Sequence, residues 1–180
     1  MKVTKSIIIN RSPEEIYGFW RDFRNLPRFM RHLESVDITA DGRSHWKAKG
    51  PAGTKVEWDA EITEDRPNEL IAWRSLEGAD VPNSGWVRFS KATGGRGTMV
   101  TTYIEYDPPA GKAGSLVAKL FGEEPEMQVR DALGALKQVL ETGEVVLSEA
   151  TIEGSRVKQP AAQPPEQWNP TPMPTYSATL

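Results

Sequence analysis

Apolar and polar residues alternate over most of residues 34 to 107, and this period of two predicts β-strands. Around Trp58, for example, Val56 and Ala60 fall on the same face, while the charged residues between them fall on the other. Turns rich in glycine, proline, asparagine and aspartate separate six such stretches, with no helical stretch between them. Consecutive strands joined by short turns pair antiparallel, so the pattern predicts a six-stranded meander.

The residues before this meander predict one more strand and two short helices. Residues 2 to 10 include three consecutive isoleucines, which favours an opening strand. Ser12-Pro13-Glu14-Glu15 is a capping-box sequence with proline at the first helical position, so a helix begins there. Its apolar residues recur at helical spacing: Ile16, Phe19, Trp20 and Phe23. A second short helix is predicted after Asn25.

Helical spacing returns after the meander. The stretch from Gly111 to Gly122 contains Leu116, Val117, Leu120 and Phe121, and a longer helix is predicted from Pro125 to about Glu141, closed by Gly143. The longer helix has one apolar stripe and needs a sheet to cover. The pattern therefore predicts an α+β fold: a curved antiparallel sheet of about seven strands with a long C-terminal helix across it.

The alternation also assigns the two faces of the sheet. The residues predicted to face inward include Trp46, Trp58, Trp73, Ser75, Phe89, Thr102, Ile104 and Tyr106. The residues predicted to face outward are Lys47, Lys49, Arg74, Arg88 and Glu105. A register slip of one residue would turn Arg74 inward, where it would need an anionic partner.

Charge and composition exclude several classes of function. The 180 residues contain 22 Lys and Arg and 25 Asp and Glu, a net charge of −3 that gives no drive towards nucleic acid. There is no cysteine, and the two histidines, His32 and His45, are expected to be solvated. We therefore expect no metal site and no cofactor. The apolar run Ile7–Ile9 is too short for a signal peptide, so a cytoplasmic protein is expected.

The last 36 residues differ in composition from the rest. Residues 145–180 contain six of the 14 prolines and few clustered apolar side chains. Such a segment cannot offset its ordering entropy by burial, which predicts a domain at residues 1–144 and an extended or disordered tail. Trp168 and Tyr176 in this tail could engage a partner, which makes an interaction module one alternative function.

Several segments resemble the START-like (SRPBCC) superfamily, in particular its polyketide cyclase/dehydrase branch and the coenzyme Q-binding START-like proteins. They are Ser12–Ile16 with Phe19-Trp20, Asn25–Met30, Trp58–Asn68, Ile71–Ser75 and Leu136–Glu144. The resemblance covers roughly residues 1–144. It implies a helix-grip fold, in which the C-terminal helix lies over the concave face of the sheet and leaves an elongated apolar cavity.

Transferred to this sequence, the resemblance places a ligand-binding wall on the eight inward residues given above, with Leu133 and Leu136 across from them. It implies noncovalent binding, and transfer, of a hydrophobic small molecule such as a lipid or quinone-like compound. A fully packed core without a cavity is the alternative reading of the same aromatic side chains.

The enzymatic alternative is a cyclase/dehydratase acting on a polyketide-like or aromatic substrate in the same cavity. The inward polar residues, Ser75, Thr102 and Tyr106, include no good general base, and no acid/base pair is evident. The sequence therefore identifies no catalytic residue and favours a binding protein over an enzyme.

A basic edge is predicted near the second helix. Arg21, Arg24, Arg28 and Arg31 follow one another at spacings of three and four residues. Their simplest interpretation is a solvated surface. Together with the apolar helix at Leu116–Phe121, they could instead contact an anionic membrane at the mouth of the cavity.

Overall fold

The computed structural model describes residues 1–49, 55–106 and 125–143. In chain order, its elements are β1 (Lys2–Ile9), α1 (Pro13–Arg21), η1 (Phe23–Arg28), β2 (Leu33–Ile38), β3 (Ser44–Lys49), β4 (Lys55–Arg66), β5 (Leu70–Ser75), β6 (Asn83–Lys91), η3 (Thr93–Gly95), β7 (Thr98–Tyr106) and α3 (Pro125–Thr142). The predicted helix at residues 111–122 and the predicted tail at residues 145–180 lie outside the described residues, and the boundary at residue 144 stays a prediction.

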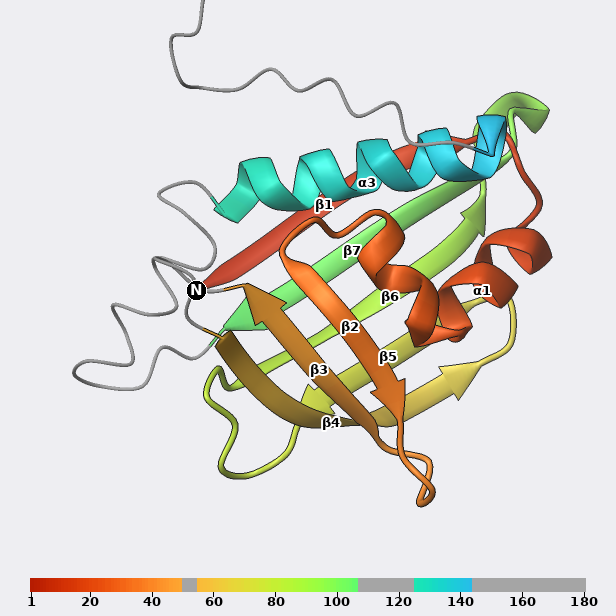
Figure 1. Cartoon of the computed structure of the whole chain (residues 1–180). Coiled ribbons are helices and arrows are strands. Elements are labelled where there is room, and N and C mark those ends of the chain that lie inside the picture. Colours follow the sequence, from red (N-terminus) through yellow and green to blue (C-terminus); the bar gives the residue numbers. More distant parts are fainter. Residues whose placement is uncertain (50–54, 107–124, 144–180) are drawn as a thin grey trace, which may run out of the picture. The chain divides into compact units, whose positions relative to one another are not determined.

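The strands form one antiparallel sheet in the order β1-β7-β6-β5-β4-β3-β2 (Figure 1). Strands β2 to β7 follow each other as the predicted meander, and β1 pairs with β7 at the other end of the sheet. The curved sheet with its C-terminal helix is a helix-grip fold, which confirms the fold predicted from the sequence.

Strand register places the predicted inward residues on one face. Trp46 lies opposite Trp58 across β3 and β4, and Trp73 lies opposite Ile62 across β4 and β5. The alternation breaks between Ile62 and Glu64, where the register shifts by one residue. This β-bulge interrupts the strict period of two in the second half of β4.

The first helix begins as its sequence predicts. The Ser12 hydroxyl accepts a hydrogen bond from the Glu15 backbone N–H, and the Glu15 carboxylate accepts one from the Ser12 backbone N–H. The second helix differs from the prediction because it is a 3-10 helix that begins at Phe23, before Asn25. Asp22 caps it through the Arg24 backbone N–H. This short helix contains Pro27, which cannot donate a backbone hydrogen bond.

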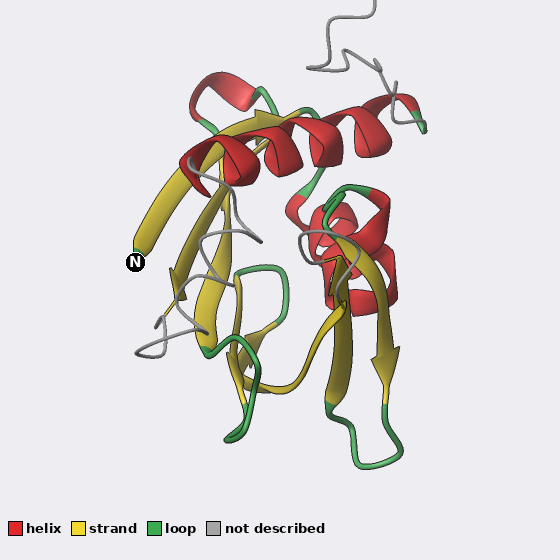
Figure 2. Cartoon of the chain, turned by 60° about the vertical axis from the view of Figure 1, so that its left-hand side comes forward, coloured by secondary structure: helices red, strands yellow, loops and turns green. Residues whose placement is uncertain are grey.

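Helix α3 is attached to β1 and to the turn that follows it (Figure 2). The Lys5 ammonium group lies 2.6 Å from the Glu126 carboxylate, and the Lys137 ammonium group donates to the Ile8 carbonyl. The Glu141 carboxylate accepts from the Asn10 backbone N–H. These contacts orient the apolar stripe of α3, including Val129, Leu133 and Leu136, towards the core. Among the described helices, none is long and apolar enough to cross a membrane.

Candidate functional site

A cavity lies in the interior, bordered by the inner face of the sheet, α3 and the segment from α1 to β2. The described residues that line it are Trp20, Phe23, Leu26, Phe29, Met30, His32, Leu33, Trp46, Trp58, Trp73, Asn83, Thr102, Ile104, Tyr106, Gln128, Val129, Ala132 and Leu133. Its volume, counted as the space open to the centre of a water molecule, is about 60 Å³. One water needs about 10–15 Å³ on this measure, so larger ligands require the lining side chains to move.

Aromatic rings form much of the wall on the side of β3 and β4. The Trp46 and Trp58 rings stack with centroids 5.7 Å apart and planes 18° apart, and Phe23 meets Trp46 edge-on. The Trp46 indole N–H donates to the Ser44 hydroxyl at 2.8 Å, and that hydroxyl donates to the Ala60 carbonyl. Because the polar end of Trp46 is satisfied within the sheet, its apolar surface is left for the cavity.

Gly85 makes room for Trp73 on the neighbouring strand. Gly85 and Trp73 are paired across β5 and β6. A side-chain carbon at Gly85 would lie 2.7 Å from the Trp73 ring and 2.6 Å from the Tyr103 carbonyl oxygen. The sequence therefore positions this ring by leaving out a side chain beside it.

Polar side chains are a minority among the described lining residues, and none of them is Asp, Glu, Lys or Arg. Burial removes water from the His32 ring and lowers its pKa from 6.5 to about 4, so the ring is neutral at pH 7. Burial also raises the pKa of the Tyr106 phenol, which stays protonated. Thr102 is 2% exposed, and its hydroxyl forms no hydrogen bond with any described residue.

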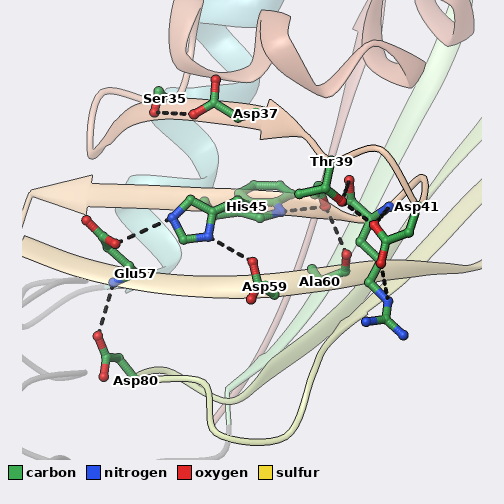
Figure 3. A network of polar contacts seen from close by, with 12 residues as sticks. Ser35, Asp37, Thr39, Asp41, His45, Glu57, Asp59, Ala60 and Asp80 are labelled. Atoms are coloured by element: carbon green, nitrogen blue, oxygen red, sulfur yellow. Dashed lines mark hydrogen bonds and ion pairs between the residues drawn. The ribbon is translucent and has the colours of Figure 1, made fainter.

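Charged groups instead occupy the outer face of the sheet. Arg74 is exposed and lies 2.6 Å from the Glu61 carboxylate, so the alternative register that would turn it inward is excluded. His45 also points outward, and its ring contacts Asp59 at 2.8 Å and Glu57 at 3.4 Å (Figure 3). Neither residue is available to chemistry inside the cavity.

Seven of the ten residues predicted to contact a ligand line the cavity: Trp46, Trp58, Trp73, Thr102, Ile104, Tyr106 and Leu133. The other three lie elsewhere. The Ser75 hydroxyl accepts from the Asn83 backbone N–H, and Phe89 packs against Tyr17 and Trp20. Leu136 is fully buried in the core, one helical turn from Leu133. The structure therefore places these three outside the cavity wall.

The sequence missed the contribution of the segment from α1 to β2. The sequence predicts a solvated His32, whereas the structure places His32, between η1 and β2, among the residues that line the cavity. The helical spacing of Trp20 and Phe23 did indicate their burial. It could not indicate that they border a cavity, because that depends on how α1 and η1 pack against the sheet.

The four arginines of the predicted basic edge differ in their contacts. Arg21 lies 2.6 Å from Asp65, and Arg24 lies 2.7 Å from Asp22. The Arg28 guanidinium lies over the Phe19 ring, 5.1 Å from its centroid. Among the described residues, neither Arg28 nor Arg31 forms an ion pair. Contact of this edge with a membrane stays a prediction, and its partner helix at residues 116–121 lies outside the described residues.

Residues 9–133 match the family described as polyketide cyclase/dehydrase and lipid transport. The chain belongs to this family. A curated relative is a protein of 17.2 kDa from Streptomyces lincolnensis, encoded between melC2 and rnhH, which is 31% identical over 107 residues. That alignment covers 59% of this chain and 69% of the relative.

Solved structures of other proteins are also similar to this chain. A Deinococcus radiodurans protein is 39% identical with a TM-score of 0.65, and the match covers 79% of this chain and 99% of that one. The aromatase/cyclase Zhui from a Streptomyces strain is 16% identical with a TM-score of 0.61, covering 79% of this chain and 97% of its own. At that identity the second match establishes the fold alone.

Proposed function

We propose that this member of the polyketide cyclase/dehydrase and lipid transport family binds a hydrophobic small molecule noncovalently in the internal cavity, and transfers it. A lipid or quinone-like compound is the ligand class that we infer. The observation that carries the proposal is the cavity itself, whose described walls are mostly aromatic and aliphatic and contain no charged side chain. Transfer of apolar surface from water into such a cavity contributes roughly 25 cal/mol per Å².

Apolar surfaces on two parts of the fold support the proposal. Trp46 and Trp58 offer flat apolar surfaces on the sheet, and Leu133 offers an aliphatic one on α3. A volume of about 60 Å³ accommodates a small group, so binding of a whole lipid or quinone involves displacement of the wall.

The proposal is tested by filling the cavity from α3. Ala132 lines the cavity, whereas Gln138 is exposed on the same helix, so Ala132→Leu and Gln138→Leu form a matched pair. We expect wild type and Gln138→Leu to bind naphthalene in a saturation-transfer NMR titration. We expect Ala132→Leu to lose at least ten-fold in affinity, because the added side chain occupies the space that the ring needs.

Two results would contradict the proposal. One is a wild-type protein that shows no saturable binding of naphthalene. The other is equal affinity in both variants, which would place the bound ring outside the cavity. Urea unfolding of each variant identifies a loss of binding that comes from a loss of folding. Native mass spectrometry of the purified protein, followed by solvent extraction, then identifies a natural ligand that remains bound.

A second candidate function is a cyclase/dehydratase-type enzyme, and His32 is the observation that favours it. Its imidazole is the one aromatic nitrogen base among the described lining residues. A base with a pKa of about 4 accepts protons poorly at pH 7, which favours binding over catalysis. Turnover of an aromatic polyketide-like substrate by wild type, with loss in His32→Gln and retained substrate binding, would support the enzyme instead.

A further inference from the structure

The buried hydroxyl groups of the sheet differ in whether they form a hydrogen bond. Three such residues are almost fully buried: Ser44, Thr98 and Thr102. The Ser44 hydroxyl donates to the Ala60 carbonyl, and the Thr98 hydroxyl donates to the Arg11 carbonyl at 2.8 Å. The Thr102 hydroxyl forms no hydrogen bond with any described residue. Since buried polar groups in folded proteins are normally paired, Thr102 needs an explanation.

The position of Thr102 in the fold limits what that explanation can be. Thr102 lies on β7, where it pairs with Lys5 of β1 and Val87 of β6. Strand β7 lies between these two strands in the sheet (Figure 1). The backbone groups of neighbouring strands are engaged in the ladder. The preceding residue, Thr101, points to the other face of the sheet, and its hydroxyl is hydrogen-bonded to the Ser6 hydroxyl at 2.9 Å. The inward hydroxyl instead borders the cavity, so an occupant of the cavity can be its partner.

The remainder of the wall indicates the charge of that occupant. Among the described lining residues there is no Asp, Glu, Lys or Arg, and His32 is neutral at pH 7. An ionised group in the cavity would lose its hydration and gain no counter-charge from these residues. These residues therefore favour an uncharged group in the cavity over an ionised one.

We propose that the ligand is an uncharged ring compound with a hydroxyl or carbonyl group, and that this group forms a hydrogen bond with the Thr102 hydroxyl. This inference rests on the proposed function and names the polar feature of the ligand. The aromatic walls contact the ring, and Thr102 fixes its orientation. A threonine hydroxyl both donates and accepts, so it serves a phenol-like or a ketone-like oxygen equally.

The test compares two neutral probes that differ in one hydroxyl group, naphthalene and 2-naphthol. Affinities are measured by saturation-transfer NMR for wild type, Thr102→Val and Thr102→Ser. We expect wild type to bind 2-naphthol roughly 3- to 10-fold more tightly than naphthalene, the factor that one neutral hydrogen bond supplies. Thr102→Ser keeps this preference because it keeps the hydroxyl, whereas Thr102→Val removes it. Affinity for naphthalene serves as the reference within each protein, so the preference for 2-naphthol is compared and not the absolute affinity.

The outcomes separate this inference from the proposed function. Absence of naphthalene binding in wild type contradicts the proposed function. Binding of naphthalene with no preference for 2-naphthol, or with the same preference in Thr102→Val, contradicts only the role of Thr102. A third probe, 2-naphthoate, is anionic at pH 7, and affinity equal to that of 2-naphthol would contradict the requirement for an uncharged ligand.

Stability gives an independent readout. Thr102→Val replaces an unpaired buried hydroxyl with a methyl group, so the urea midpoint of the ligand-free variant should equal or exceed that of wild type. A clearly lower midpoint would mean that the hydroxyl has a structural partner in the protein, and would overturn the proposal. The full chain is used throughout.

Discussion

At the scale of single residues, the polar groups around the cavity are held in different ways. The Trp46 indole N–H is engaged by Ser44, so this tryptophan offers only its apolar surface. His32 is kept neutral by the protein packed around it. Thr102 brings a hydroxyl to the wall without a partner among the described residues. The cavity therefore combines a low polarity with a defined position for a hydrogen bond at Thr102.

The lowered pKa of His32 predicts a pH-dependent stability. In the folded protein, His32 stays neutral down to about pH 4. In the unfolded chain, His32 binds a proton near pH 6.5, so acid favours unfolding. The contribution is complete above pH 6.5 and is lost as the pH falls towards 4. When the pH falls from 7 to 4.5, the free energy of unfolding should decrease by roughly 2 to 3 kcal/mol more in wild type than in His32→Gln, according to the same linkage relation.

Urea unfolding at both pH values measures this difference. Each protein serves as its own reference at pH 7, so a change in packing caused by the substitution cancels. Equal losses in wild type and His32→Gln would mean that the imidazole titrates in the folded protein as it does in the unfolded chain.

Residues of the wall could be predicted from the sequence only where strand alternation determines their direction. Trp58, Thr102 and Tyr106 alternate with neighbours of which those described are less buried, and all three line the cavity. Phe89 alternates equally well but lies under α1, where it packs against Tyr17 and Trp20. Alternation gives the face of a sheet. It does not give the element that covers each part of that face.

At the scale of elements, two glycines have opposite surroundings. Gly134 lies within α3, and a side-chain carbon there would meet nothing within 4 Å. Gly85 lies within β6, where the same carbon would approach the Tyr103 carbonyl oxygen to 2.6 Å. Gly134 lowers the stability of its helix although a side chain would fit there. At Gly85, the neighbouring atoms leave no room for a side chain.

The substitution of alanine at each of these glycines should therefore change stability in opposite directions. Gly134→Ala should raise the free energy of unfolding by roughly 0.5 to 1 kcal/mol, since alanine favours the helix interior. Gly85→Ala should lower it by about 1 to 3 kcal/mol, because a backbone oxygen and the Trp73 ring must move. Urea unfolding of the two variants tests both values, and a shift in the same direction for both would contradict this account.

The boundaries of elements depended on different signals. The capping box at Ser12 and the left-handed Gly143, with a φ of +82°, marked the start of α1 and the end of α3 correctly. The sequence predicts the second helix after Asn25, whereas η1 begins at Phe23. The early start has no separate signal because Asp22, which caps η1, also ends α1. The bulge in β4 was not predicted, since the residues around Glu64 carry no glycine or other local signal.

At the scale of the whole molecule, the charged side chains of the described residues lie on the outside, and mostly apolar side chains line the cavity. The basic edge is the part of this surface that could contact a membrane. Arg21 and Arg24 already interact with carboxylates, whereas Arg28 and Arg31 are exposed and form no ion pair among the described residues. The two pairs of arginines therefore differ in their availability to phosphate groups.

This difference predicts the result of a cosedimentation experiment. Vesicles of phosphatidylcholine and phosphatidylserine should bind the protein at low salt and release it at high salt. Arg28→Gln with Arg31→Gln should reduce binding more than Arg21→Gln with Arg24→Gln, although each double variant removes two positive charges. No binding at low salt, or equal reduction, would exclude direct contact of Arg28 and Arg31 with anionic headgroups.

The pairing of β1 with β7 has a consequence for synthesis in the cell. Ile9 pairs with Thr98 and Lys2 pairs with Glu105, so each residue of the first strand meets a partner made about 90 to 100 residues later. At a translation rate of 5 to 20 residues per second, β1 waits roughly 5 to 20 s after leaving the ribosome before β7 follows. During this interval its isoleucines are exposed to chaperones and to other nascent chains. The meander from β2 to β7 can pair as it emerges, and β1 completes the sheet last.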